Sequence, residues 1–477
     1  MKPIDIRLLS RTLIALMCAL LIVLLPSLRL NLMPKEIIWY MDGQRLIEVA
    51  LLGSILLEAA LINLIPKNSV TTNPLTIQNK MRYAFLLLLV LAITSASLAQ
   101  SPRLAVIEIT TFIGLSYLAL FVAREFLADK EILLKRLTYG LWISLLLYMV
   151  SFYVGYATAI IFKAPLKWPL PFSGFSNIRH FNQYQLWGLG LIYLPLFSFS
   201  LKKNTHILLN IALVFWWVLL FYSASRGVLL AWFLAILSTA IIYKKIAWPF
   251  VRTQITHIVI GYISYIVLFK IIPEQSNFTL VVGTIMRETT NDRIGLWSVA
   301  LDLVLKHPIF GVGPMQYVWH YPTNAHPHNS LLQLASEWGL PATLIILLIS
   351  VYGIHKWLTR FNKNKLISSN KSDANLTILL FFTVVANFVY SLVDAVIVMP
   401  ISQVMMFITI GLMIGHYLYG NIPEISKSLF RPIIAGIVLI SLAISTLPEI
   451  TQGISGSEKG FSMGYSAIGP RFWREMK

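Results

Sequence analysis

Apolar runs long enough to cross a lipid bilayer recur along the whole of this 477-residue chain. A membrane span takes about 20 helical residues, and in lipid each backbone polar group must be satisfied within a helix or a closed barrel. We count about thirteen such runs, at residues 11–28, 46–65, 81–99, 104–122, 138–162, 184–200, 206–223, 227–243, 254–272, 341–358, 376–397, 401–420 and 432–449. Barrels show short alternating segments instead. The sequence therefore predicts an all-α, polytopic membrane helical bundle of about 12–13 transmembrane helices, forming a single domain over residues 1–477.

The composition agrees with a membrane protein. Charged residues make up 12% of the chain, against about 25% in soluble domains. Cys18 is the one cysteine, so no disulfide framework or cysteine metal site is expected. Met1–Leu30 resembles a signal peptide but lacks a clear cleavage site, so we expect an uncleaved first span. A net charge of +18 suggests nucleic acid in a soluble protein. Here cytoplasmic loops explain most of it, and membrane lipids are the expected partners, with no nucleic acid.

Basic residues alternate between loops and so predict the orientation. Clusters that include Lys67, Lys130, Lys202, Lys244 and Lys363 mark the cytoplasmic side, together with the N-terminus. The opposite, periplasmic side receives loops at 29–45, 163–183, 224–226, 273–340 and 398–400, and the short C-terminal tail 451–477. Several cations gather on that side against the general trend: Lys163, Lys167, Arg179, Arg226, Arg287 and Arg293.

The long loop at 273–340 is the main polar interruption of the chain. Apolar residues at helical spacing from Asp292 to Lys306, namely Ile294, Trp297, Leu301, Val304 and Leu305, predict an amphipathic helix along a membrane or bundle face. Further on, the segment His326-Pro327-His328-Asn329 precedes SLLQLASEW, in which Ser330 and Gln333 have the spacing of a capping box. The sequence thus predicts a histidine at the N-terminus of a helix.

Three interpretations of this histidine pair remain open. An H-x-H pair can bind zinc, but no cysteine or clear carboxylate accompanies it, so no metal and no cofactor are predicted. A packing role is the second interpretation, and it applies to His326 more than to His328. The third is a general base, because the positive end of the following helix disfavours protonation of the imidazole.

Two further segments have alternative interpretations. Arg226, in Ser223-Ala224-Ser225-Arg226-Gly227, either marks a helix end or binds a phosphate bidentately. The segment Ser173–Gln185 carries Arg179, His180, Asn182 and Gln183, which either satisfy helix ends and lipid head groups or line a cavity for a pyrophosphate and sugar hydroxyls.

Taken together, these motifs resemble the O-antigen ligase/polymerase family. The matching elements are SASRG, R-x-x-L-W-x-x-A from Arg293, HPIFGVGP and AHPHNSLLQLASEWGLP, all within Ser223–Pro341. Weaker support comes from SGFSNIRHFNQYQ and from YSLVDAVIVMP around Asp394. The family includes lipopolysaccharide O-antigen ligases, O-antigen polymerases and protein O-oligosaccharyltransferases.

The resemblance implies a metal-independent, inverting glycosyltransferase of the bacterial inner membrane, with its site facing the periplasm. The donor would be a glycan linked to undecaprenyl diphosphate. His328 would deprotonate the acceptor hydroxyl, while Arg226 and Arg293, with Arg179 as a third cation, would bind the diphosphate. Further candidates for substrate contacts are His326, Asn329, Gln183 and Asn182.

The acceptor separates the remaining hypotheses. Lipid A-core is the favoured acceptor, which makes the chain an O-antigen ligase. The same site would serve a pilin serine or a growing glycan. A transporter or flippase of an anionic lipid-linked solute is the alternative of another class, because it also combines many spans with buried cations. Such a transporter predicts inverted repeats, and the sequence shows none.

Overall fold

The computed structural model describes residues 6–27, 40–61, 79–167, 175, 178–276, 278, 280–281, 293–321, 324–420 and 430–454. Within these residues, nine helices are long and apolar enough to cross a membrane, and the stretches Ser10–Leu24 and Met81–Ser97 form shorter apolar helices. The prediction of an all-α, polytopic membrane bundle is confirmed. Arg287 and residues 455–477 of the predicted tail lie outside the described residues.

The elements follow the chain in this order: α1 (Ile6–Ala19), η1 (Leu20–Leu24), α2 (Leu25–Ser27), α3 (Tyr40–Leu61), α4 (Asn79–Ser97), α5 (Pro102–Ala128), α6 (Lys130–Ile161), β1 (Leu166–Lys167), α7 (Ile178–Ser198), α8 (Lys203–Ser223), α9 (Arg226–Tyr243), η3 (Lys244–Ile246), α10 (Trp248–Ile266), η4 (Val267–Ile271), α11 (Ile272–Gln275), β2 (Leu280–Val281), α12 (Arg293–Lys306), η5 (Tyr317–Trp319), α13 (Ser330–Trp338), α14 (Leu340–Arg360), α15 (Lys363–Ile367), α16 (Lys371–Ser391), α17 (Pro400–Leu418) and α18 (Phe430–Ile454). Every predicted apolar run overlaps one of these helices.

One predicted span is too long. The run 376–397 continues the helix through Asp394, whereas α16 ends at Ser391 and residues 392–399 form a loop before α17. Two local features keep this loop from being helical. The Asp394 carboxylate accepts a hydrogen bond from the N–H of Ala395 at 2.7 Å, which competes with helical bonding. At the end of the loop, Pro400 restricts Met399 to extended backbone. The loop 392–399 is therefore a distinct element between two spans.

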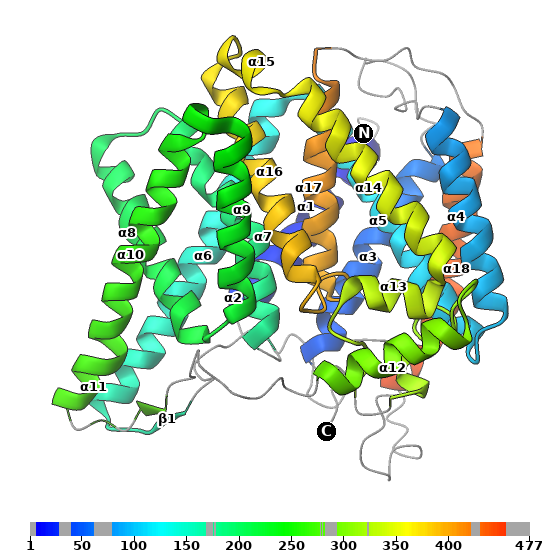
Figure 1. The fold of residues 1–477 in the computed structure, drawn as a ribbon, viewed down its shortest axis with the longest axis horizontal. Coiled ribbons are helices and arrows are strands. Elements are labelled where there is room, and N and C mark those ends of the chain that lie inside the picture. Colours follow the sequence, from blue (N-terminus) through cyan, green and yellow to red (C-terminus); the bar gives the residue numbers. More distant parts are fainter. Residues whose placement is uncertain are drawn as a thin grey trace, which may run out of the picture.

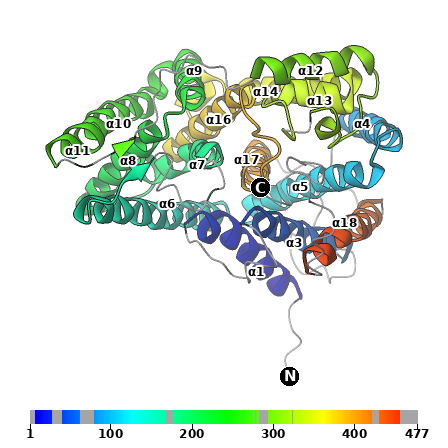
Figure 2. The ribbon, with the colours of Figure 1, turned by 90° about the horizontal axis from the view of Figure 1, so that it is seen from below.

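Helix α7 lies deep within the bundle. All its residues from Phe181 to Pro195 are buried, and it packs mainly against α16, α17 and α6. Helix α17 packs most extensively on α5, and in the view along the bundle it lies near the centre, with the other helices around it (Figure 2). An apolar helix buried on all sides by other helices forms the core of a membrane bundle.

Two helices lie at one end of the bundle, beside α4 and α14 (Figure 2). Helices α12 and α13 run across the direction of the spans, at the opposite end from α15 (Figure 1). At the same end, β1 and β2 pair in parallel, with Leu166 opposite Leu280, so two loops predicted to share one face do meet. This end collects the chain segments that carry the predicted site.

Helix α12 confirms the predicted helix, and a different side of it packs against the protein. The side buried in the protein is formed by Leu296, Ala300 and Leu303. Of the residues predicted to form the apolar face, Leu301 is 50% exposed and Leu305 is 80% exposed. The sequence Arg293–Lys306 is apolar on more than one side, so the periodicity alone does not fix which side packs.

Candidate active site

The segment His326–Asn329 leads directly into α13. The Asn329 side-chain Oδ1 accepts hydrogen bonds from the N–H groups of Leu331 and Leu332, each at 3.0 Å. Asn329 is thus the N-cap, and Ser330 is the first helical residue. The predicted capping box of Ser330 and Gln333 is wrong by one position, because asparagine is at least as good a cap as serine and precedes it. The prediction of a histidine at the helix N-terminus holds, since His328 immediately precedes the cap.

His328 is held in an unusual backbone conformation. Its φ is 53°, in the left-handed region that costs a non-glycine residue about 1–3 kcal/mol. The indole Nε1 of Trp297, on α12, donates a hydrogen bond to the carbonyl of the preceding residue, Pro327, at 3.0 Å. The Asn329 cap fixes the chain on the other side. Such strain persists only where the surroundings determine it, so two helices together set the position of this imidazole.

A carboxylate faces the imidazole. The Nδ1 of His328 lies 3.3 Å from Oδ1 of Asp394, whose side chain is 2% exposed. Oδ2 of Asp394 accepts a hydrogen bond from the Tyr390 hydroxyl at 2.5 Å. Burial alone would raise the pKa of this carboxyl, but the hydrogen bond and charge of His328, the Tyr390 bond and the charge of Arg179 together lower the pKa below its ordinary value. Asp394 is therefore an anion, and its carboxylate can only accept hydrogen bonds.

The ionised carboxylate decides the tautomer of the imidazole. Because Asp394 has no proton to give, the hydrogen bond requires a proton on Nδ1 of His328, and in the neutral ring the lone pair is then on Nε2. The His328 side chain is 18% exposed, so the ring is partly accessible. A histidine oriented in this way through Nδ1 can accept a proton at Nε2, which is the geometry of a general base.

Three arginines approach this pair from three helices. Arg179 lies in the first turn of α7, Arg226 begins α9 and Arg293 begins α12. Arg293 interacts electrostatically with both Arg179 and Arg226. Burial lowers the pKa of Arg293, and the charge of Arg179 lowers it further, yet a guanidinium remains charged at any physiological pH.

This cationic arrangement favours an anion for two reasons. A cation at a helix N-terminus is opposed by the positive end of the helix dipole, so each arginine adds to a potential that is already positive. Backbone N–H groups at such ends also bind phosphates. The structure therefore brings together Arg179, Arg226, Arg293 and His328, which are the main residues predicted from the sequence.

The turn that carries Arg226 is held from both sides. The Asn182 side-chain amide on α7 donates a hydrogen bond to Oγ of Ser223 at 2.8 Å. Gly227 packs against α16 so closely that an added Cβ would lie 2.9 Å from Cε2 of Tyr390. Asn182, a candidate for contacting substrate, thus uses its NH₂ group to hold the SASRG turn.

The remaining candidates lie within or beside the same cluster. Gln183 is 1% exposed and follows Arg179 by one helical turn. His326 is 7% exposed, and its ring lies 4.4 Å from that of His328, centroid to centroid, in an edge-on arrangement. Among the described residues, no group of three or more His, Cys, Asp or Glu side chains is placed to share a metal ion. The substrate roles of these candidates remain predictions.

Asp394 and Tyr390 were not predicted as site residues. A single acidic residue within the apolar run YSLVDAVIVMP is the signal that could have identified Asp394, because a charge at membrane depth is costly and is commonly functional. His180 also belongs to the cluster, since it interacts electrostatically with Asp394, His328 and Arg179.

One comparison with known proteins matches part of the chain. No curated protein matches the chain. Residues 211–347 match the model of a family described as O-antigen ligase. This segment runs from α8 into α14 and contains Arg226, Arg293 and His328, so the match covers three of the four main predicted residues. Through this segment, the chain is similar to the O-antigen ligase family.

Proposed function

We propose that this protein transfers an oligo- or polysaccharide from an undecaprenyl-diphosphate carrier to a hydroxyl of lipid A-core, at the periplasmic face of the bacterial inner membrane. The observation that carries the proposal is the pairing of His328 with Asp394 beside three arginines at helix N-termini. An oriented base next to a cationic anion site is what transfer from a diphosphate requires.

The reaction divides between the two parts of the site. Nε2 of His328 takes the proton of the acceptor hydroxyl as its oxygen attacks the anomeric carbon. The bond between that carbon and the diphosphate oxygen breaks, and the electron pair leaves with the diphosphate. Asp394 stabilises the imidazolium that forms. The base must lie on the side of the sugar opposite the leaving group, so the configuration inverts.

The arginines supply the electrostatic part of catalysis. Arg179, Arg226 and Arg293 neutralise the charge that grows on the leaving diphosphate, and they are in place before the reaction begins. Because these cations supply the charge, the proposed transfer needs no metal ion. Holding both substrates in one geometry provides the rest of the rate enhancement.

The acceptor can be identified in cells. A deletion strain is complemented with wild type, His328→Ala or His355→Ala, an exposed histidine on α14 that serves as the control. We expect wild type and His355→Ala to restore O-antigen on lipid A-core, while His328→Ala leaves the polymer on its carrier. Retained transfer by a well-expressed His328→Ala protein would overturn the assignment of the base.

Two other acceptors give different results in the same strains. A normal lipopolysaccharide pattern with unglycosylated pilin, read from the mass of the pilin, would make the protein an O-oligosaccharyltransferase. Short glycans attached normally to lipid A-core would indicate a polymerase. In both cases the site would be the same, and only the acceptor in the proposal would change.

A further inference from the structure

The loop that carries Asp394 is fixed by side chains that bind its carbonyl groups. Three successive carbonyls, those of Val396, Ile397 and Val398, accept hydrogen bonds from Ser402 Oγ at 2.6 Å, Gln403 Nε2 at 2.9 Å and Arg45 Nη2 at 2.8 Å, respectively. Carbonyls outside regular structure need such partners when they are buried. The end of the loop 392–399 is thus bound along consecutive residues.

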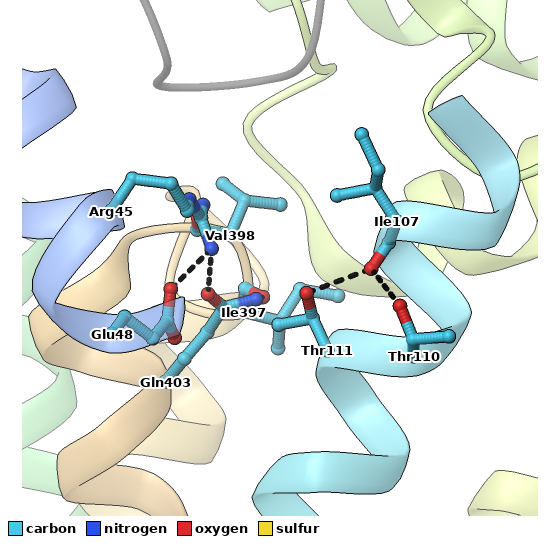
Figure 3. A network of polar contacts seen from close by, with 8 residues as sticks. All are labelled: Arg45, Glu48, Ile107, Thr110, Thr111, Ile397, Val398 and Gln403. Atoms are coloured by element: carbon cyan, nitrogen blue, oxygen red, sulfur yellow. Dashed lines mark hydrogen bonds and ion pairs between the residues drawn. The ribbon is translucent and has the colours of Figure 1, made fainter. Parts of the chain in front are cut away.

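Arg45 reaches this loop from a distant part of the chain. It lies on α3, 353 residues before Val398 in the sequence. Its Nη1 donates to Oε1 of Gln403 at 2.8 Å and forms an ion pair with Glu48, one turn further along α3. Figure 3 shows the guanidinium between Glu48, Gln403 and the loop backbone. The Arg45 side chain is 3% exposed, and that of Glu48 is fully buried.

Stability alone gives little reason for a buried ion pair here. The cost of removing both charges from water can exceed their attraction, and apolar residues of similar volume are often as stable. What the charged pair adds is geometry, because a guanidinium has several donors in a fixed plane. Arg45 uses that plane to bind the loop carbonyl and the Gln403 amide at the same time.

We propose that Arg45 and Gln403 are positioning residues that hold the loop 392–399 so that Asp394 faces His328. This inference rests on the proposed function, because it assigns a role to the pair that forms the base. Neither residue belongs to the helices that carry the three arginines, which are α7, α9 and α12. Loosening the loop should therefore affect the base and leave diphosphate binding intact.

The test uses a paired substitution that keeps the interior free of unpaired charge. Arg45→Met with Glu48→Met removes both charges and the bond to Val398. The matched control is Arg124→Met with Glu58→Met, which removes a different ion pair, 2.6 Å long, that joins α5 to α3. Glu125, which also pairs with Arg124, keeps its ion pair with Arg11. Arg45→Lys is the second variant, because lysine keeps the charge beside Glu48 but lacks the planar fork.

Transfer is measured on purified protein with undecaprenyl-diphosphate-linked glycan and lipid A-core from the deletion strain. We expect the Arg45 and Glu48 pair of substitutions to lower kcat by about 10- to 100-fold, as displacements near 1 Å do. The donor KM should stay within about twofold. The kcat of Arg45→Lys should lie between those of this variant and wild type. The Arg124 and Glu58 control should have the kcat of wild type.

Two readouts separate positioning from a general loss of structure. Hydrogen exchange of the amides in 392–399 should become faster in the Arg45 variants and not in the control. In an Asp394→Asn background, the Arg45 and Glu48 substitutions should change kcat by less than about twofold, because residues acting through one another are not additive. Unchanged exchange, or a full loss of kcat in that background, would overturn the inference.

Different experiments test the proposed function and the role of Arg45. If His328→Ala still transferred glycan, the base assignment would be wrong whatever the results for the Arg45 variants. The exchange measurement needs no substrate, so it still decides whether Arg45 holds the loop. If both Arg45 variants failed to fold, Gln403→Leu would remove the hydrogen bonds of Gln403 with Ile397 and Arg45 without altering either charge. The same exchange and kinetic outcomes would apply.

Discussion

His328 and Asp394 lie 3.3 Å apart, Nδ1 to Oδ1, although 66 residues separate them in the sequence. His328 precedes α13 at one end of the bundle, and Asp394 lies in the loop between α16 and α17. The contact therefore joins the loop-rich segment that matches the family model to spans outside it. The alignment of the proposed base depends on how these parts pack.

Replacing Asp394 by asparagine should weaken the base without removing it. The amide has the same shape but no charge to stabilise the imidazolium. A placed base contributes about 10²–10⁴-fold to the rate, and we expect Asp394→Asn to lose part of this, about 10- to 100-fold in kcat. Steady-state kinetics of transfer provide the measurement.

Asp302→Asn is the control for this substitution, because Asp302 lies on α12 and pairs only with the exposed Lys306 in the described part of the chain. It should leave kcat at the wild-type value. An Asp394→Asn protein with normal kcat would show that the carboxylate does not orient His328.

Arg226→Gln and Arg293→Gln should each raise the donor KM. Hydrogen bonds to charged groups contribute about 1.5–3 kcal/mol, which corresponds to about 10- to 100-fold in affinity. Arg252→Gln is the matched control, since Arg252 is exposed near the start of α10 and follows the opposite end of α9 from Arg226. Binding of undecaprenyl diphosphate by the purified variants provides the measurement. Equal affinity for all three variants would contradict the diphosphate site.

Hydropathy and motif spacing predicted much of this molecule. The apolar runs identify the helices because membrane spans have a fixed length and composition. Arg179, Arg226, Arg293 and His328 were found individually, since each is unusual where it stands in the sequence. Their convergence required the fold, in which three helices begin at one end of the bundle.

The parts that were not predicted have physical reasons. Asp394 was hidden within a hydropathy window that continued to residue 397, because one charge changes an average over many apolar residues only slightly. The role of Arg45 could not be predicted, because its partners Gln403 and Val398 lie more than 350 residues away. The cap position was missed because Asn329 and Ser330 are both good caps, and only the backbone conformation distinguishes them.

Substitutions at Asn329 and Ser330 test which of the two residues caps α13. Asn329→Ala should lower the free energy of unfolding by about 1 kcal/mol. It should also reduce transfer, because Asn329 directly follows His328 and its capping hydrogen bonds fix the backbone there. Asn329→Asp keeps the accepting oxygen and should retain stability. Ser330→Ala should be close to neutral, since Ser330 Oγ is buried without a hydrogen-bond partner in the described structure. Thermal unfolding of the four proteins provides the measurement. A larger loss in Ser330→Ala than in Asn329→Ala would contradict the observed cap.

Gly339 joins α13 to α14 with a φ of +82°, and an added Cβ would lie 2.1 Å from the carbonyl oxygen of Ile309. Gly339→Ala should therefore destabilise the protein by about 1–3 kcal/mol through backbone strain, and the clash should add to this. Gly353→Ala, within α14, meets no atom within 4 Å and should stabilise the helix by about 0.5–1 kcal/mol. Apparent melting temperatures should move in opposite directions. A shift in the same direction for both variants would exclude the close approach at Gly339.

Acid sensitivity should report on Asp394. Because the folded protein lowers the pKa of this carboxyl, the unfolded chain binds its proton at a higher pH than the folded one does. The stability from the ionised carboxylate is therefore complete above the ordinary pKa of about 3.9 and is lost as the pH falls through the lower folded value. The difference in melting temperature between wild type and Asp394→Asn should be constant above about pH 5 and shrink below about pH 4. A difference that shrank instead between pH 8 and about pH 6, where unperturbed histidines titrate, would show that Asp394 is not the group whose charge is stabilised.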